Sequence, residues 1–135
     1  MDCHENKKFR AGIVVLKRFP TGFKMLCLRI YGSYDLPKGG LEFNEDVFDG
    51  ALRETEEECG IVDLDFEWGY ETCQLRNVIL FVASTKESPN IRPNPHTGEF
   101  EHHAARWLEL DEAENNLHPY LRPCVSWVRK KIGAL

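Results

Sequence analysis

Three glutamates within one stretch of five residues, Glu54, Glu57 and Glu58, have the type and spacing that suit chemistry on a phosphorylated substrate. In a helix, residues three and four positions apart lie on the same face, so the three carboxylates would share one edge. Like charges this close repel each other, and a hard divalent cation removes that repulsion. Mg²⁺ accepts carboxylate oxygens and fills its remaining positions with water and substrate phosphates. The spacing therefore favours a site for Mg²⁺ or Mn²⁺.

The residues around these glutamates have the pattern of an amphipathic helix. Asn44 suits the N-cap, and Glu45 and Asp46 place negative charge in the first turn. Gly60 suits the left-handed residue after the last turn. Apolar residues recur at steps of three and four, which indicates a helix that packs one stripe on a sheet. This stripe consists of Val47, Phe48, Ala51, Leu52, Thr55 and Cys59.

The glutamates belong to a longer set of fixed positions, with the spacing G-x5-E-x7-R-E-U-x-E-E-x-G-U, where U is a bulky apolar residue. The set consists of Gly39, Glu45, Arg53, Glu54, Glu57, Glu58 and Gly60. A solvated acidic helix face is the alternative, but it would not explain Gly39, Arg53 and Gly60. The segment resembles the Nudix box, although Thr55 stands where the pattern has a bulky aliphatic residue. The resemblance implies a divalent-metal-dependent hydrolase that cuts a diphosphate linkage in a nucleoside diphosphate joined to another group.

Each residue of the box then has an expected role. Glu57 and Glu58 are predicted as direct metal ligands, and Glu54 either as a third ligand or as the base that deprotonates the attacking water. Arg53 is expected to pair with Glu45 or with a metal-ligating glutamate and so to fix its orientation. A surface salt bridge is the alternative for Arg53.

Lys38 precedes the glycine of the box. The resemblance implies that the backbone carbonyl of Lys38 faces the metal. Its ammonium group either meets a substrate phosphate or is simply solvated.

A second resemblance concerns the segment Glu101-His102-His103-Ala104-Ala105-Arg106-Trp107-Leu108. Together with Leu36-Pro37-Lys38-Gly39 and with Thr55, it is similar to the asymmetrical diadenosine tetraphosphate hydrolases. The similarity implies that Glu101 approaches the metal from a loop. The chain departs from the group at Gly40, where a histidine is usual, and at Ala105, where a tyrosine that stacks on a base is usual.

Substrate recognition rests on residues outside the box. Tyr31 and Tyr34 flank the glycine turn before the box and are predicted to offer a ring to a nucleobase, with a role as loop or core aromatics as the alternative. The proline-rich loop over 86–100 is expected to form one wall of the pocket. His102 and His103 either touch phosphate or are partly exposed residues at the edge of the sheet.

Three functions remain open. The first is cleavage of dinucleoside polyphosphates, with diadenosine tetraphosphate split into ATP and AMP by water attack on phosphorus. The second is the same chemistry on RNA 5′ triphosphate ends, ADP-ribose or oxidised nucleoside triphosphates. The third is a non-catalytic nucleotide-binding module. The full set of carboxylates argues against it, because a protein that only binds nucleotides has little need for a complete metal cluster.

Composition agrees with one domain over residues 1–135 that binds a small nucleotide substrate. The net charge of −5 argues against a stable complex with nucleic acid. The cysteines, Cys3, Cys27, Cys59, Cys73 and Cys124, are odd in number and form no C-x-x-C pair, which favours reduced thiols in the cytoplasm. No apolar segment is long enough for a signal peptide or a membrane span.

The order of elements predicts an α+β fold. Strands are expected over 11–17, 23–30, 63–73, 78–84 and 106–110, the first two joined in a hairpin. A loop over 32–44 precedes the box helix, Asp111 caps a short helical turn, and Pro119 opens a helix that ends near residue 132. The resemblance implies a Nudix-type α/β/α sandwich with a mixed β-sheet, which fits this order.

Overall fold

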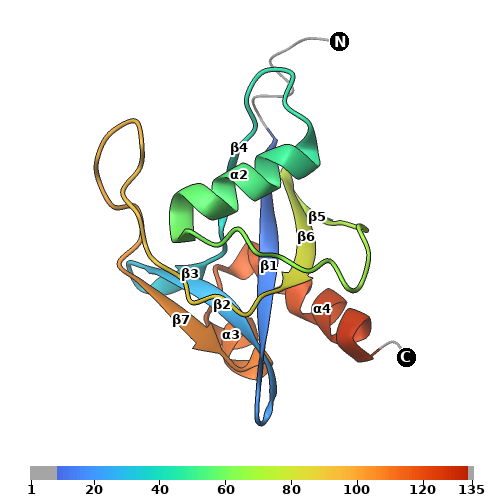
Figure 1. Ribbon diagram of the computed structural model, residues 1–135. Helices are drawn as coiled ribbons and strands as arrows, with labels where there is room; N and C mark the ends of the chain where they lie inside the picture. The colour runs from blue at the N-terminus through green and yellow to red at the C-terminus, as the bar shows by residue number, and fades with distance from the viewer. Residues whose placement is uncertain (1–8, 134–135) are drawn as a thin grey trace.

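In the computed structural model, which describes residues 9–133, a mixed sheet carries helices on both of its faces (Figure 1). The strands are β1 (Arg10–Phe19), β2 (Gly22–Ile30), β3 (Ser33–Asp35), β4 (Lys38–Gly40), β5 (Cys73–Leu75), β6 (Val78–Ser84) and β7 (Ala104–Leu108). The helices are α2 (Val47–Cys59), α3 (Leu110–Asn116), the 3-10 helix η1 (Pro119–Leu121) and α4 (Pro123–Gly133). None of these helices is long and apolar enough to cross a membrane.

The strands lie in the order β3-β2-β1-β6-β5, with β4 also paired to β1 and β7 to β2. β1 and β6 are parallel, and the other pairs are antiparallel. β1 and β2 form the predicted hairpin, in which Phe19 pairs with Gly22 across the turn. The mixed sheet expected from the sequence is therefore confirmed.

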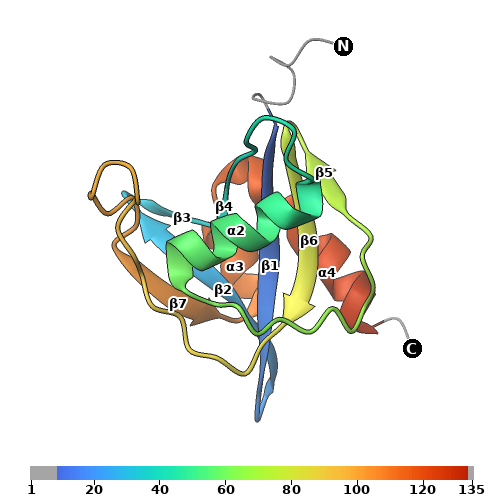
Figure 2. The same ribbon diagram turned by 45° about the horizontal axis from the view of Figure 1, so that its top comes forward.

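Two apolar cores cover the two faces of the sheet, because successive side chains of a strand point to opposite sides. Ile13 and Val15 of β1 pack in one core with Ala51 of α2. Val14, between them, packs in the other core with Val125 of α4. Figures 1 and 2 show α2 across one face of the sheet and α3 with α4 on the other. This arrangement is the predicted α/β/α sandwich.

The prediction of a strand over 63–73 is wrong for most of that segment. Asp65 makes only an isolated bridge to Ser84, and the strand β5 begins at Cys73. The backbone N–H of Gly69 donates to the carbonyl of Phe66, and Gly69 has a φ of 92°. This tight turn ends the extended run that the partial alternation had suggested.

The predicted elements near the C-terminus need three corrections. The last strand is β7, which ends at Leu108, so it lies two residues earlier than expected. The cap of α3 is Glu109 rather than Asp111, and its side chain forms a capping box with Glu112. The helix predicted from Pro119 is divided into η1 and α4, because Pro123 has no N–H to donate to a preceding turn.

The segment over 32–44, predicted as a loop, contains the two short strands β3 and β4. β4 has the sequence Lys38-Gly39-Gly40, which carries no preference for a strand by itself. It forms because Gly12 and Ala11 of β1 pair with Lys38 and Gly39. This pairing places the start of the box directly beneath α2 (Figure 2).

Candidate active site

The helix α2 that carries the glutamates begins two residues later than its sequence suggests. Its N-cap is Asp46, whose carboxylate accepts the backbone N–H groups of Phe48 at 3.1 Å and Asp49 at 3.3 Å. Asn44, the predicted cap, has a φ of 61° and lies in the turn before the helix. Several cap-forming residues follow one another here, so the sequence alone does not distinguish between them. Gly60 ends the helix with a φ of 75°, as predicted.

Thr55, the residue that departs from the box pattern, is fully buried on the side of α2 that faces the sheet. Its hydroxyl donates to the carbonyl of Ala51 at 2.8 Å. The hydroxyl therefore has its hydrogen bond within the helix, which allows a threonine to lie where an aliphatic residue is usual.

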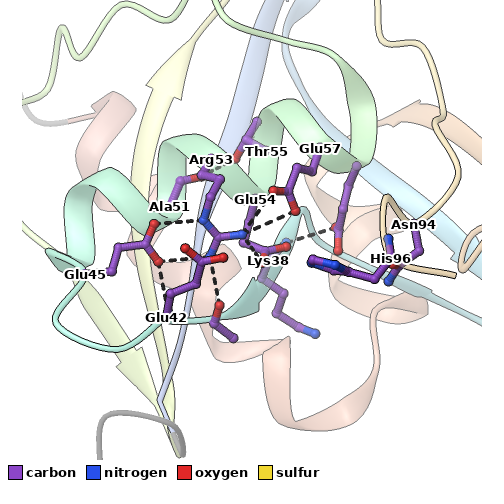
Figure 3. A network of polar contacts seen from close by, with 12 residues as sticks. Lys38, Glu42, Glu45, Ala51, Arg53, Glu54, Thr55, Glu57, Asn94 and His96 are labelled. Carbon is purple, nitrogen blue, oxygen red and sulfur yellow. Dashed lines mark hydrogen bonds and ion pairs between the residues drawn. The ribbon is translucent and has the colours of Figure 1, made fainter.

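Arg53 lies at the centre of the carboxylates and binds several of them (Figure 3). Its Nε and Nη2 donate to the two carboxylate oxygens of Glu45, at 2.8 and 2.9 Å. Its Nη1 donates to Glu54 at 2.9 Å and to Glu57 at 3.2 Å, and Nη2 also donates to the carbonyl of Gly40. The hydrogen bonds from Arg53 hold the pKa of Glu45 below its usual range. Arg53 therefore pairs with Glu45, as predicted, and also with two of the glutamates predicted at the metal.

The strand β4 brings its backbone against two of the glutamates. The N–H of Lys38 donates to Oε1 of Glu58 at 3.1 Å. A Cβ on Gly39 would lie 2.1 Å from the carboxyl carbon of Glu54. Cβ atoms in proteins essentially never come closer than 3.0 Å to such an atom, so the two groups would overlap. Gly39 therefore lets the backbone and Glu54 approach each other, which only a residue without a side chain permits.

Glu58 and Glu54 lie in surroundings that disfavour a negatively charged carboxylate. Burial raises the pKa of Glu58 to about 9, although the Lys38 N–H acts against it, and the neighbouring Glu54, Asp35 and Glu101 add to the rise. Burial also raises the pKa of Glu54, which its contact with Arg53 opposes. A divalent cation would relieve this crowding. Hard carboxylate oxygens are the ligands that Mg²⁺ and Mn²⁺ take, so these residues fit the ion.

The raised pKa of Glu58 predicts how the stability of the metal-free protein depends on pH. The folded chain holds the Glu58 proton more tightly than the unfolded chain, whose carboxyl has its ordinary value of 4.5. This contribution to the free energy of unfolding is fully present below that value and is lost as the pH rises towards about 9. Urea unfolding in excess chelator, compared between the wild type and Glu58→Gln, measures it. We expect the variant to lose less stability with rising pH, and parallel curves for the two proteins would contradict the prediction.

The loop over 86–100 holds Glu101 opposite α2. Nδ2 of Asn94 donates to the carboxylate of Glu101 at 2.7 Å. Oδ1 of Asn94 accepts the backbone N–H groups of His96 and Thr97, at 2.8 and 3.3 Å. The backbone N–H of Arg92 donates to the carbonyl of Glu58, which joins the loop to the helix. Asn94 thus orders the loop and orients Glu101 with the same side chain.

These groups surround a cavity of about 300 Å³ between α2, β4 and the loop. Seven of the predicted site residues line it: Lys38, Arg53, Glu54, Glu57, Glu58, Glu101 and His102. Arg92, Asn94, Pro95 and His96 also line it, and they belong to the loop that was expected to form one wall of the substrate pocket. In Figure 3 the ring of His96 points from the loop towards the carboxylates. The sequence predicted the loop but assigned none of these four residues to the site, and it also missed Arg10.

Lys38 and His102 share a buried contact with Asp35 beside this cavity. The ammonium of Lys38, whose side chain is 3% exposed, lies 3.1 Å from Oδ1 of Asp35. Nε2 of His102, which is 6% exposed, lies 3.5 Å from Oδ2 of the same residue. The alternative in which Lys38 is simply solvated is therefore wrong. The alternative in which His102 is partly exposed is also wrong. His103, by contrast, is exposed.

The two tyrosines predicted to stack on a base do not line this cavity. Tyr31 is 90% exposed and its ring meets the ring of His103 edge-on, with centroids 4.8 Å apart. Tyr34 pairs with Arg29 in the sheet and packs against the core beneath α4. A role for either in binding a base stays a prediction.

A larger cavity, of about 450 Å³, lies away from Glu54, Glu57 and Glu58. Lys17, Asp65 and Thr85 are among the residues that line it, and none of the predicted site residues does. Volume alone therefore does not mark the site, since the smaller cavity is the one that the box residues line.

The geometry of the box agrees with the comparison of the whole sequence with protein families. The family model described as NUDIX domain matches residues 5–128. The chain belongs to the NUDIX family. Hydrolases of this family act on pyrophosphate bonds, and the chain is an enzyme of this type. The comparison with curated proteins found no match.

Solved structures of NUDIX proteins resemble the whole chain in fold. Ap4A hydrolase of C. elegans, in a binary complex, has a TM-score of 0.72 at 18% identity, over 93% of this chain and 98% of that one. Dihydroneopterin triphosphate pyrophosphohydrolase of E. coli has a TM-score of 0.65 at 14% identity, over 90% and 94%. The NUDIX domain of Shewanella oneidensis NrtR, complexed with ADP ribose, has a TM-score of 0.64 at 12% identity, over 92% and 87%. At these identities the likeness concerns the fold alone.

Proposed function

We propose that this NUDIX enzyme hydrolyses dinucleoside polyphosphates and splits diadenosine tetraphosphate into ATP and AMP by water attack on one phosphorus. The observation that carries the proposal is the cavity in which Glu54, Glu57 and Glu58 of α2 face Glu101 of the loop. Glu101 belongs to the segment that resembles the asymmetrical diadenosine tetraphosphate hydrolases. A neighbour in fold is itself an Ap4A hydrolase.

The carboxylates would hold Mg²⁺ or Mn²⁺, together with the backbone carbonyl of Lys38. The bound cation would lower the pKa of a water molecule and offset the charge of the phosphates. Glu54 serves either as a further ligand or as the base that accepts the proton of the attacking water. Arg53 orients Glu54 and Glu57 through its hydrogen bonds.

Positive side chains at the rim of the cavity suit a polyphosphate. Arg10 and Arg92 line the cavity together with the carboxylates. Guanidinium groups bind phosphate oxygens through two parallel hydrogen bonds, so they would hold the phosphates that extend beyond the metal. The buried His102 and the predicted rings of Tyr31 and Tyr34 are the other residues that we propose near the bound substrate.

The second candidate is the same chemistry on another nucleotide, such as ADP-ribose, an RNA 5′ triphosphate end or an oxidised nucleoside triphosphate. Ala105 favours it, because the stacking ring usual at this position is missing. In β7, Ala105 pairs with Leu28 and packs against the core beneath α2. The NrtR domain complexed with ADP ribose shows that this fold accommodates that ligand in another protein.

Product analysis in ¹⁸O-labelled water tests the proposal. The purified protein is given Mg²⁺ and, in parallel, diadenosine tetraphosphate, ADP-ribose, 5′-triphosphorylated RNA and an oxidised nucleoside triphosphate. We expect ATP and AMP from the first substrate, with one ¹⁸O atom in one product. Two ADP molecules would exclude the asymmetric cut. A kcat/KM about tenfold higher on another substrate, which corresponds to about 1.4 kcal/mol, would move the assignment to the second candidate.

Metal removal gives a further prediction. We expect activity with Mg²⁺ or Mn²⁺, none in excess EDTA, and full recovery when Mg²⁺ is added back. Activity should rise towards alkaline pH, because a carboxylate-bound ion lowers the pKa of a bound water without ionising it fully at neutrality. Ca²⁺ should bind and support little turnover. Full activity in excess EDTA would refute the metal-dependent mechanism.

The proposal includes a cytoplasmic setting. Among the residues that the structure describes, Cys27, Cys59, Cys73 and Cys124 are free thiols, and Cys3 lies outside the described residues. Burial raises the pKa of Cys59 and of Cys124 to about 12, so these thiols are not nucleophiles at neutral pH. Reduced, buried thiols are typical of a compartment that keeps cysteines reduced.

A further inference from the structure

One group of potential metal ligands in the cavity includes a nitrogen. A carboxylate oxygen of Glu58, a carboxylate oxygen of Glu101 and a ring nitrogen of His102 all lie within 4.8 Å of one another. Two ligands of one ion, each about 2.1 to 2.2 Å from it, are at most about 4.4 Å apart. Three ligands cannot all lie opposite one another, and two ligands at right angles on such an ion are only about 3 Å apart, so each of the three atoms would move by up to about 1 Å to bind a single cation.

The surroundings of His102 suit a metal ligand. Its side chain is 6% exposed, and its Nε2 lies 3.5 Å from Oδ2 of Asp35. A histidine that binds a metal characteristically directs its other ring N–H to a carboxylate, which fixes the orientation of the ring. Nε2 lies beside Asp35, and Nδ1 is the second ring nitrogen that could meet a cation.

Asp35 is in contact with Lys38 as well as with His102. The ammonium of Lys38 lies 3.1 Å from Oδ1 and 3.2 Å from Oδ2 of Asp35, and the Lys38 side chain is 3% exposed. This buried cation already offsets the charge of Asp35.

We propose that His102 is a nitrogen ligand of the cation in this site, and that the site binds Mn²⁺ in preference to Mg²⁺. Imidazole nitrogen is a softer ligand than carboxylate oxygen, and affinity for nitrogen rises along the first-row transition metals, whereas Mg²⁺ favours oxygen ligands. The inference rests on the proposed function only in placing a divalent cation at Glu58 and Glu101. It adds the identity of a third ligand and the class of the preferred metal.

Electron spin echo spectroscopy of the protein loaded with Mn²⁺ tests the inference without any turnover. A directly bound imidazole nitrogen modulates the echo through its ¹⁴N nucleus, and a carboxylate does not. We expect ¹⁴N modulation in the wild type, its loss in His102→Gln, and its replacement by a ¹⁵N signal when the protein is made with ¹⁵N-histidine. If His102→Gln does not fold, the labelled wild type still shows whether a histidine binds the ion, and labelled His96→Gln tests the other histidine that lines the cavity.

His96→Gln is the matched control, because His96 lines the same cavity from the loop. It should keep the ¹⁴N signal. We also expect calorimetric affinity for Mn²⁺ to fall at least about tenfold in His102→Gln, with a smaller change for Mg²⁺. Mn²⁺ binding without ¹⁴N modulation in the wild type, or loss of the signal in His96→Gln alone, would overturn the role of His102 and leave the proposed function standing. Failure of the wild type to bind Mn²⁺ at all would overturn both.

Discussion

We expect Glu58→Gln to lower kcat by at least about a hundredfold, the low end for a group that directly stabilises developing charge. The amide of glutamine can still accept the Lys38 N–H that now binds Oε1 of Glu58 at 3.1 Å, so the contact between α2 and β4 survives. The variant loses only the negative charge, and burial already disfavours that charge in the absence of metal. Turnover should therefore collapse while the fold persists. Steady-state kinetics with saturating Mg²⁺ and circular dichroism measure the two effects.

Glu56→Gln is the matched control for this variant. Glu56 is on the same helix but is exposed, and it is not among the residues that line the cavity. The same chemical change should leave kcat within about threefold of the wild type, as is usual for surface substitutions. Glu57→Gln should lose about as much activity as Glu58→Gln. If Glu57→Gln and Glu58→Gln both kept their activity with unchanged circular dichroism, the assignment of the carboxylates to a metal would be wrong.

The parts of this site that the sequence predicts are those made by residues close together in the chain. The helical period places Glu54, Glu57 and Glu58 on one edge of α2, and Arg53 reaches Glu45, which lies just before the N-cap of the same helix. These relations depend on one helix and not on the rest of the fold. The carboxylate edge of α2 and the pairing of Arg53 with Glu45 were therefore predictable before any strand was placed.

The parts that the sequence missed depend on partners far along the chain. Lys38 reaches Glu58 because β4 pairs with β1, and nothing in the residues Lys-Gly-Gly indicates a strand. His102 is buried because the segment before β7 lies against Asp35, so its exposure could not be judged from its neighbours in sequence. Asn94 and His96 line the cavity because hydrogen bonds within the loop hold them there. A loop has no repeating pattern of apolar residues from which such positions could be predicted.

The boundary errors have a different cause. Asn44, Glu45 and Asp46 all suit the first residues of a helix, and the choice of Asp46 follows from the left-handed turn at Asn44. Local preference restricts the cap to a few residues. The path of the chain from β4 into α2 then decides which of them it is.

Gly39→Ala should lower kcat by about a hundredfold, the loss that a displacement of about 1 Å at a reacting group can cause. A Cβ at this position would overlap the carboxyl carbon and both oxygens of Glu54, so either the glutamate or the strand β4 must move. Movement of β4 would also shift the Lys38 N–H away from Glu58. Gly40→Ala is the control, because a Cβ on Gly40 meets nothing within 4 Å. Kinetics and Mn²⁺ affinity of both variants check the prediction. Equal activity of Gly39→Ala and Gly40→Ala would show that the close approach of Glu54 to β4 is not needed for catalysis.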